Sequence, residues 1–408
     1  MGGEKRYSPN RRLIFFICWI TYIMAYLCRV NFSSALGKLE TALSVNSSSL
    51  GIIGSLFFIT YACGQLINGY IGDKISPYKF ITLAIFGTAL LNILITFTDN
   101  FFLIMILWGA NGYFQSMLWG PLMRLLSMHF DKKYNVNIST GMSTSMVMGF
   151  SISWSVFGRA FMNYSWQYYF IIPAIGSLIL GLLWVKLSSN DSGTTILEKK
   201  QDLNIKELLN TIAKEKLWII ALICLCQGLI KESLSLWAPI LLIRVFNIEL
   251  KSSFAFILIV PAANFIGILY SRKMIKKYEN HIKTALLIMF GIAIGCSLVL
   301  LLLNGASAIV SVILIAAISG MMYGSNNILL SYIPLTFAHK NIVSTLVGIF
   351  DFSSYAGAAI SSVILGIMLA DSNYNLIFII WAAVAAIATI LSILYGLTRR
   401  SETKHCSV

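Results

Sequence analysis

The chain contains little charge. Asp, Glu, Lys and Arg make up 11% of its 408 residues, against about 25% in soluble proteins. Hydrophobic residues make up 58%, and the mean hydropathy is +0.80. These values exclude a cytosolic enzyme or a nucleic-acid-binding domain, and we expect no nucleic-acid partner. They predict an all-α polytopic membrane protein.

Histidine and paired cysteine are absent from the expected membrane interior. The four histidines (129, 281, 339 and 405) fall in expected loops or the tail, and the seven cysteines contain no CxxC pair. No phosphate-binding glycine loop or nucleophile motif stands in a suitable context. We therefore expect no metal, no cofactor and no catalytic residue.

Apolar runs of membrane-spanning length are abundant. Twelve are bounded by charged or turn residues, at about 13–36, 50–72, 80–98, 101–126, 138–160, 166–188, 217–246, 252–271, 284–303, 307–335, 342–370 and 374–398. A polar stretch divides them six and six. We therefore predict an N-terminal six-helix bundle (1–188), a cytoplasmic linker (189–216) with an amphipathic helix near Ile205–Ile212, and a C-terminal six-helix bundle (217–408).

The basic residues indicate the orientation. If the N-terminus is cytosolic, the inner loops, the linker and the tail hold most of the lysines and arginines, and the outer loops hold only Lys38, Arg159, Arg244 and Lys251. Cytoplasmic loops of membrane proteins carry this excess. We expect a monomer in the cell (inner or plasma) membrane with both termini in the cytoplasm.

Four charged residues lie well inside predicted spans: Arg29, Lys231, Glu232 and Asp351. A charge at the bilayer centre costs at least about 2.5 to 3.5 kcal/mol, so such residues are candidates for function. Arg29 and Lys231 occupy similar depths in spans one and seven, 202 residues apart. Two cations, one from each half, could clamp a phosphate or carboxylate, about 8 to 14 Å apart across one central cavity.

The acids suggest a coupling role. Adjacent helical residues point about 100° apart, so Glu232 is a poor partner for Lys231. We expect Asp351 to be the partner, with Asp351 and Glu232 as candidates for proton coupling. The alternative is that each cation pairs with a carboxylate and merely locks helices together.

Polar side chains gather at helical spacing around these cations. They could orient a polar ligand, or equally form interhelical hydrogen bonds. The candidates for substrate binding are Tyr22, Tyr26, Tyr61, Gln65, Gln115, Tyr323, Asn327 and Tyr355, with Asn111 and Asn326 beside them.

Several motifs resemble a known family. GYIGDKISPYK (69–79) resembles the major facilitator superfamily signature between spans two and three, and makes Gly69, Asp73 and Lys74 candidates for gating. YLCRVNF around Arg29, GANGYFQSMLWGPLMR (109–124), LWAP in span seven and VGIFDFSSYAGAA (347–359) are similar to the organophosphate:phosphate antiporters. This resemblance implies two six-helix bundles that alternate access to a central site.

It also implies exchange of a phosphate ester for inorganic phosphate. The phosphoryl group would be held by Arg29 and by a span-seven arginine, which is Lys231 here. Gln65 replaces the lysine and Met146 the histidine of glycerol-phosphate transporters, which argues against glycerol 3-phosphate itself. A proton-coupled organic-acid symporter and a transport-silent sugar-phosphate sensor remain alternatives.

Overall fold

The computed structural model describes residues 11–189, 205–246, 259–278, 282–303, 307–370 and 374–405. Within these ranges the secondary structure is helical and contains no strand. The first half consists of α1 (Arg11–Ala42), α2 (Ser47–Gly72), α3 (Pro77–Ile95), α4 (Phe101–Gln115), α5 (Trp119–His129), η1 (Lys132–Tyr134), α6 (Asn135–Ser151), η2 (Ile152–Phe157), α7 (Gly158–Ala160) and α8 (Tyr168–Ser189).

The second half begins with a short helix in the predicted linker. Its elements are α9 (Ile205–Lys214), α10 (Leu217–Phe246), α12 (Ile259–Lys277), α13 (Ile282–Leu303), α14 (Ala308–Asn326), η3 (Asn327–Tyr332), α15 (Ile333–Thr336), η4 (Ala338–Lys340), α16 (Val343–Ala370) and α17 (Tyr374–His405). The amphipathic helix expected near 205–212 is present as α9. Residues 190–204 of the predicted linker lie outside the described residues.

The described helices account for the twelve predicted spans. Ten segments are long and apolar enough to cross a membrane. The other two contain α6 and α12, whose sequences carry several polar residues. Three spans are interrupted: α4 is followed by α5, and the π-helices η2 and η3 continue α6 and α14. The all-α, twelve-span prediction is therefore confirmed.

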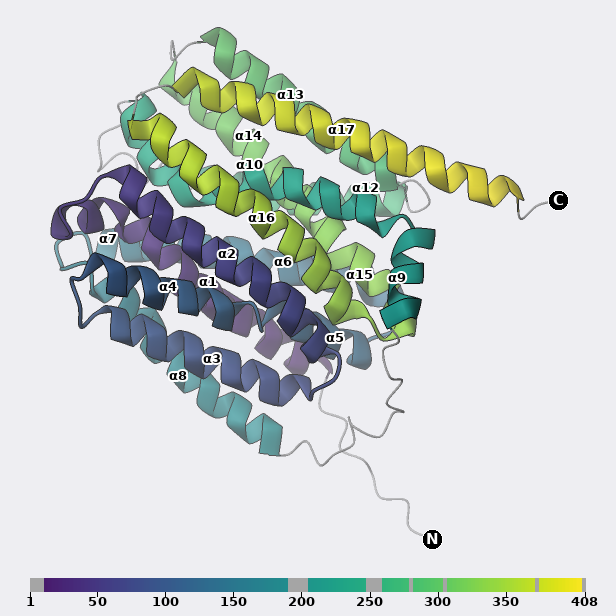
Figure 1. Ribbon diagram of the computed structural model, residues 1–408, viewed down its shortest axis with the longest axis horizontal. Helices are drawn as coiled ribbons and strands as arrows, with labels where there is room; N and C mark the ends of the chain where they lie inside the picture. Colours follow the sequence, from purple (N-terminus) through teal and green to yellow (C-terminus); the bar gives the residue numbers. More distant parts are fainter. Residues whose placement is uncertain are drawn as a thin grey trace.

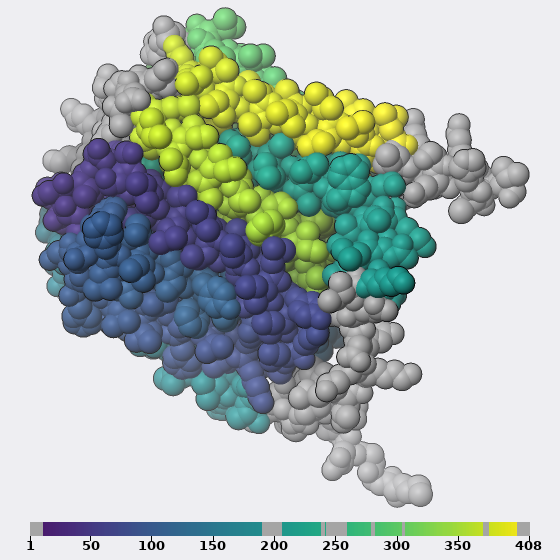
Figure 2. Space-filling model, in the orientation of Figure 1, coloured from purple at the N-terminus to yellow at the C-terminus, as the bar shows by residue number. Residues whose placement is uncertain are grey.

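The first-half and second-half helices meet along α2 and α16. Figure 1 shows α1–α8 on one side of the molecule and α10–α17 on the other, with α2 and α16 side by side. The two run antiparallel, because the start of α2 lies against the end of α16 and Asp73 at the end of α2 meets Thr345 near the start of α16. The purple and yellow-green surfaces of these helices touch in Figure 2. Large apolar side chains are exposed on α3, α8, α13 and α17, as expected of helices that face lipid.

Glycines allow α2 and α16 to pack this closely. A Cβ on Gly348 would lie 2.3 Å from the backbone oxygen of Gln65, and one on Gly69 would lie 2.9 Å from the Gly348 Cα. Neither distance is possible for a real side chain, so the backbones can approach only because both residues are glycine. We call the end at which Asp73 meets Thr345 the Asp73 end. The opposite end, at which Ser33 meets Leu236, is the Ser33 end.

Candidate anion-binding site

Arg29 lies in the middle of α1 with only 7% of its surface exposed. Its Nε donates to Gln115 Oε1 (2.9 Å) and its Nη1 donates to the Tyr355 hydroxyl (2.5 Å). The guanidinium carbon lies 4.5 Å from the ring centroid of Tyr61 and 4.9 Å from that of Tyr26. Nη2 is buried and has no hydrogen-bond partner in the part of the chain that the structure describes. Arg29 thus keeps a free donor edge inside an aromatic box.

Buried amides hold the backbone and side chain of this arginine. Gln115 and Asn111 both donate to the Cys28 carbonyl oxygen, at 3.0 and 3.1 Å. Asn92 accepts from Asn31 (2.8 Å) and lies 3.4 Å from Asn111. Gln115 was predicted to contact substrate, but the structure places it behind the guanidinium. Asn31 and Asn92 were missed, although a buried amide in an apolar span is itself a signal.

Lys231 of α10 is also buried, and it has two polar neighbours. Its Nζ donates to Asn326 Oδ1 (3.1 Å) and lies 2.5 Å from Glu232 Oε1. The prediction that Asp351 would be its ion-pair partner, with Glu232 a poor one, is therefore wrong. The side chains of Lys231 and Glu232 are long and flexible, so they can bend toward each other despite the 100° offset between neighbouring helical residues. Within the described residues, however, Glu232 Oε1 accepts no hydrogen bond of acceptable geometry.

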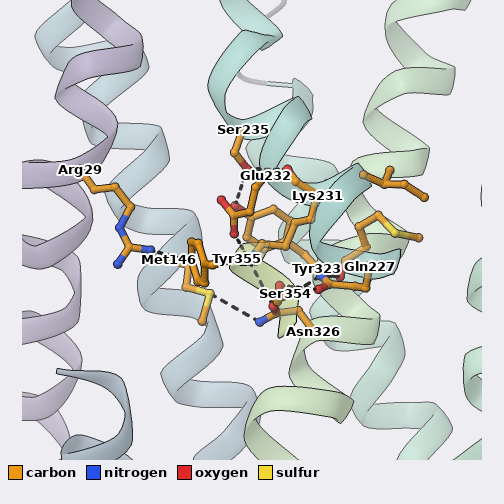
Figure 3. Close-up of polar contacts among 12 residues, drawn as sticks. Arg29, Met146, Gln227, Lys231, Glu232, Ser235, Tyr323, Asn326, Ser354 and Tyr355 are labelled. Atoms are coloured by element: carbon orange, nitrogen blue, oxygen red, sulfur yellow. Dashed lines mark hydrogen bonds and ion pairs between the residues drawn. The ribbon is translucent and has the colours of Figure 1, made fainter. Parts of the chain in front are cut away.

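A second set of polar contacts supports Lys231, and the sequence analysis missed it. Gln227, one helical turn earlier, donates to the Met322 carbonyl oxygen (3.1 Å), and Ser354 donates to Gln227 Oε1 (3.2 Å). Figure 3 shows these side chains converging between α10, α14 and α16. The i, i+4 spacing of Gln227 and Lys231 could have indicated this neighbourhood.

Tyr355 of α16 lies between the two cations. The Arg29 guanidinium carbon is 5.6 Å, and the Lys231 Nζ 5.9 Å, from the centroid of its ring. The cations are therefore at most 11.5 Å apart, below the upper limit of the expected range. Figure 3 shows Arg29 on α1 facing α10 with Tyr355 between them.

Arg29, Tyr355 and Lys231 form a layer that we call the cation layer. A cavity opens beside it, toward the Ser33 end. Arg29 and Glu232 are its charged lining residues, and Ser33 and Ser235 are its hydroxyl-bearing ones. Lys231 is not among the lining residues, which differs from the prediction that both cations face one cavity. The cause is the ion pair, because Glu232 stands on the cavity side and holds Lys231 against Asn326.

Three predicted residues lie on the other side of the layer, toward the Asp73 end. Both amide atoms of Gln65 and the hydroxyl of Tyr61 are buried and form no hydrogen bond with any residue that the structure describes. Asp351 is buried, and within the described residues it forms no ion pair or hydrogen bond. The positive charges of Lys231 and Arg29 are near enough to attract its carboxylate. These groups are polar and unsatisfied next to two cations, as expected where a ligand completes the site.

Of the remaining predicted residues, some border the cation layer and one does not. Tyr22 and Tyr26 pack edge to face at 5.2 Å, and the Tyr323 ring lies 5.4 Å from the Lys231 Nζ, so all three border the cation layer. Asn327 does not, because it donates to Ser271 (2.7 Å) in the contact between η3 and α12. Its neighbour Asn326 contacts Lys231 instead, since successive helical residues face different directions.

Asp73 closes one end of the interface between the halves. Its carboxylate accepts from the backbone N–H groups of Ser344 (3.2 Å) and Thr345 (2.7 Å) and from the Thr345 hydroxyl (2.7 Å), and Arg124 Nε lies 3.8 Å away. It therefore caps the N-terminus of α16 from another helix, where Ile342 offers no side-chain acceptor. Burial raises the pKa of Asp73 to about 6, although these hydrogen bonds oppose the rise.

Lys74 and Gly69 contribute differently to this end. Lys74 is exposed and donates to the Tyr70 hydroxyl (2.5 Å), so it does not reach the second half within the described residues. Gly69 packs on Gly348. Further contacts between the halves at this end include Asn135 to the Leu335 carbonyl (3.1 Å).

The Ser33 end is also in contact. Ser33 donates to the Leu236 carbonyl oxygen (2.9 Å), joining α1 to α10. Ser55 donates to the Ala359 carbonyl (3.1 Å), joining α2 to α16. The cation layer is thus enclosed between two sets of contacts, and each set must break for the site to open at its end.

These features define a helical membrane protein with two buried cations enclosed between two sets of helices. The Major Facilitator Superfamily matches residues 18–362, and the chain belongs to that superfamily. It is similar to a probable hexose phosphate transport protein of Chlamydia trachomatis (22% identical; 98% of this chain, 94% of the relative). It is also similar to the membrane sensor protein UhpC of Escherichia coli (20%; 95% and 92%) and a glycerol-3-phosphate transporter of Bacillus subtilis (23%; 98% and 95%).

Proposed function

We propose that the protein is a secondary transporter that exchanges a phosphate ester for inorganic phosphate by alternating access. The observation that carries this proposal is Arg29, a buried guanidinium with an unsatisfied Nη2 and, within the described residues, no carboxylate partner. An uncompensated charge at this depth is expensive, and an anionic ligand would supply the missing counter-charge. The planar donor edge suits a phosphoryl oxygen pair.

The relatives favour phosphate esters as the anion, since two of those compared are transporters of a hexose phosphate and of glycerol 3-phosphate. Lys231 would contribute the second positive charge once the ligand competes with Glu232 for it. Asp351, Gln65 and the surrounding tyrosines would complete the binding layer, and Asp351 or Glu232 would carry any coupled proton.

Alternating access would use the two sets of contacts already described. Residues 1–188 and 217–408 would rock as two bundles, with 189–216 as the linker. The described segments that connect the spans at the Asp73 end are basic and contain Lys74, Lys79, Lys132 and Lys340. This end would therefore face the cytosol. We propose a monomer in the cell membrane with both termini cytoplasmic.

Reconstituted vesicles test the proposal. Vesicles loaded with unlabelled phosphate should take up labelled phosphate, and external hexose phosphate should compete. Uptake that also runs into phosphate-free vesicles bearing a pH gradient would indicate proton symport instead of exchange. No uptake under either condition would contradict transport.

A sensor is the second candidate, because UhpC is among the relatives. A sensor would bind the sugar phosphate without moving it. A ligand-dependent rise in melting temperature of the purified protein, combined with no flux in vesicles of matched protein content, would favour it.

A further inference from the structure

Glu232 is a buried acid whose place is not explained by anion binding. It is 4% exposed, yet it lines the cavity that Arg29 also lines. A carboxylate on the wall of an anion site repels the ligand, and removing it from water is costly. Because Glu232 both repels an anionic ligand and is costly to bury, we expect it to have a compensating role.

Holding Lys231 in place does not account for Glu232. Oε1 is 2.5 Å from the Lys231 Nζ but accepts no hydrogen bond, and a buried ion pair stabilises only when its hydrogen bonds are well formed. Asn326 already positions the ammonium. Oε1 therefore has an ionic partner in Lys231 but no well-formed hydrogen bond within the described residues, and the Glu232 side chain lines a cavity.

The cavity thus presents two complementary groups. Within the described residues, Arg29 Nη2 is a donor without an acceptor, and Glu232 Oε1 is paired with Lys231 but accepts no hydrogen bond of acceptable geometry. The two residues come from opposite halves of the protein and face the same space (Figure 3). A ligand that satisfies both has an anionic group at one end and hydrogen-bond donors at the other. A carboxylate has room for about four hydrogen bonds.

We propose that Glu232 is a specificity-determining residue: it accepts hydrogen bonds from hydroxyl groups of a phosphate ester and rejects esters that carry a carboxylate at that position. This inference rests on the proposed function, in which Arg29 binds the phosphoryl group. Rejection follows from like-charge repulsion in a water-poor site, and acceptance from a charge-assisted hydrogen bond.

Two ligands of similar size provide the test. Glycerol 3-phosphate and 3-phosphoglycerate differ in having a hydroxymethyl group or a carboxylate at one carbon. Both are titrated against labelled phosphate uptake in vesicles loaded with phosphate. The wild-type protein should bind glycerol 3-phosphate at least about tenfold more tightly, the value of one charge-assisted hydrogen bond. Equal competition, or preference for 3-phosphoglycerate, would overturn the inference without any variant.

The substitution Glu232→Gln keeps the shape and removes the charge. We expect the selectivity ratio to fall about tenfold toward one, with a gain in 3-phosphoglycerate affinity. Asp131→Asn is the matched control, because it removes a carboxylate that is more than half exposed at the Asp73 end and does not line the cavity. Its ratio should stay within about twofold of wild type, whatever its rate.

The outcomes separate this inference from the proposed function. Absence of any wild-type phosphate exchange would refute the function. Exchange with a wild-type preference that Glu232→Gln leaves unchanged, or that Asp131→Asn lowers equally, would refute only the role of Glu232. If the Gln variant does not fold, the wild-type ligand pair alone decides.

Discussion

Removing the Asp73 carboxylate should open the end of the molecule that it closes. Asp73→Ala leaves the N–H groups of Ser344 and Thr345 without their acceptor and deprives α16 of its cap. At pH 5.0 Asp73 in the closed form is largely protonated and carries no desolvated charge. Loss of a cap costs about 0.5 to 2 kcal/mol and a neutral hydrogen bond contributes about 0.5 to 1.5 kcal/mol, so we expect a net change of about 2 kcal/mol at that pH.

That change corresponds to about thirtyfold in the ratio of closed to open molecules. A population about 99% closed would fall to about three quarters. Spin labels at the exposed positions Lys132 and Lys340, in a background without reactive cysteines, would report the separation of the two halves at this end. The variant should gain a longer-distance population.

Asp131→Ala is the control for this measurement. Asp131 lies at the same end, but its pair with Arg11 is 3.9 Å long and more than half exposed, and such pairs contribute little. The control should reproduce the wild-type distance distribution. A shift of less than about threefold in Asp73→Ala would refute the view that this carboxylate holds the end closed.

The pH dependence of the same distance has a defined sign. The pKa of Asp73 is raised from its ordinary 3.8 to about 6 when the end is closed, so the closed form binds the proton more tightly. Its stabilisation is complete below the ordinary value and is lost as pH rises through about 6. Acidification from pH 7.5 to 5.0 should favour closure about tenfold, and Asp73→Ala should remove that response. A shift toward the open form on acidification would contradict it.

The other predictions concern the cation layer and the helix interface. Arg29→Lys should insert normally but lose at least about thirtyfold in phosphate uptake at matched expression, because a point charge cannot reproduce the bidentate donor edge; wild-type rates would contradict this. Lys231→Arg should stay within about threefold of wild-type uptake. Gly348→Ala should lower uptake or the melting temperature, since the new Cβ would meet the Gln65 backbone oxygen at 2.3 Å, whereas the control Gly291→Ala, with nothing within 4 Å, should change neither.

The sequence by itself determined the twelve spans, the helix α9 and the burial of Arg29 and Lys231. Apolar runs of fixed length and the high cost of a charge in lipid are local or additive properties, so they can be read along the chain. The start of α10 at Leu217 was predicted because the charged residues Lys214, Glu215 and Lys216 directly precede its apolar run.

Only the tertiary structure decided how the charged residues are paired. Lys231 meets Glu232 and not Asp351, and Asn326 rather than Asn327 is its amide neighbour. These outcomes depend on rotamers and on a rotation of about 100° per residue between helices, which no periodic pattern fixes. The contact of Asp73 with Thr345 joins residues 272 positions apart, and it exists because glycines let α2 and α16 approach until a carboxylate reaches a free helix end.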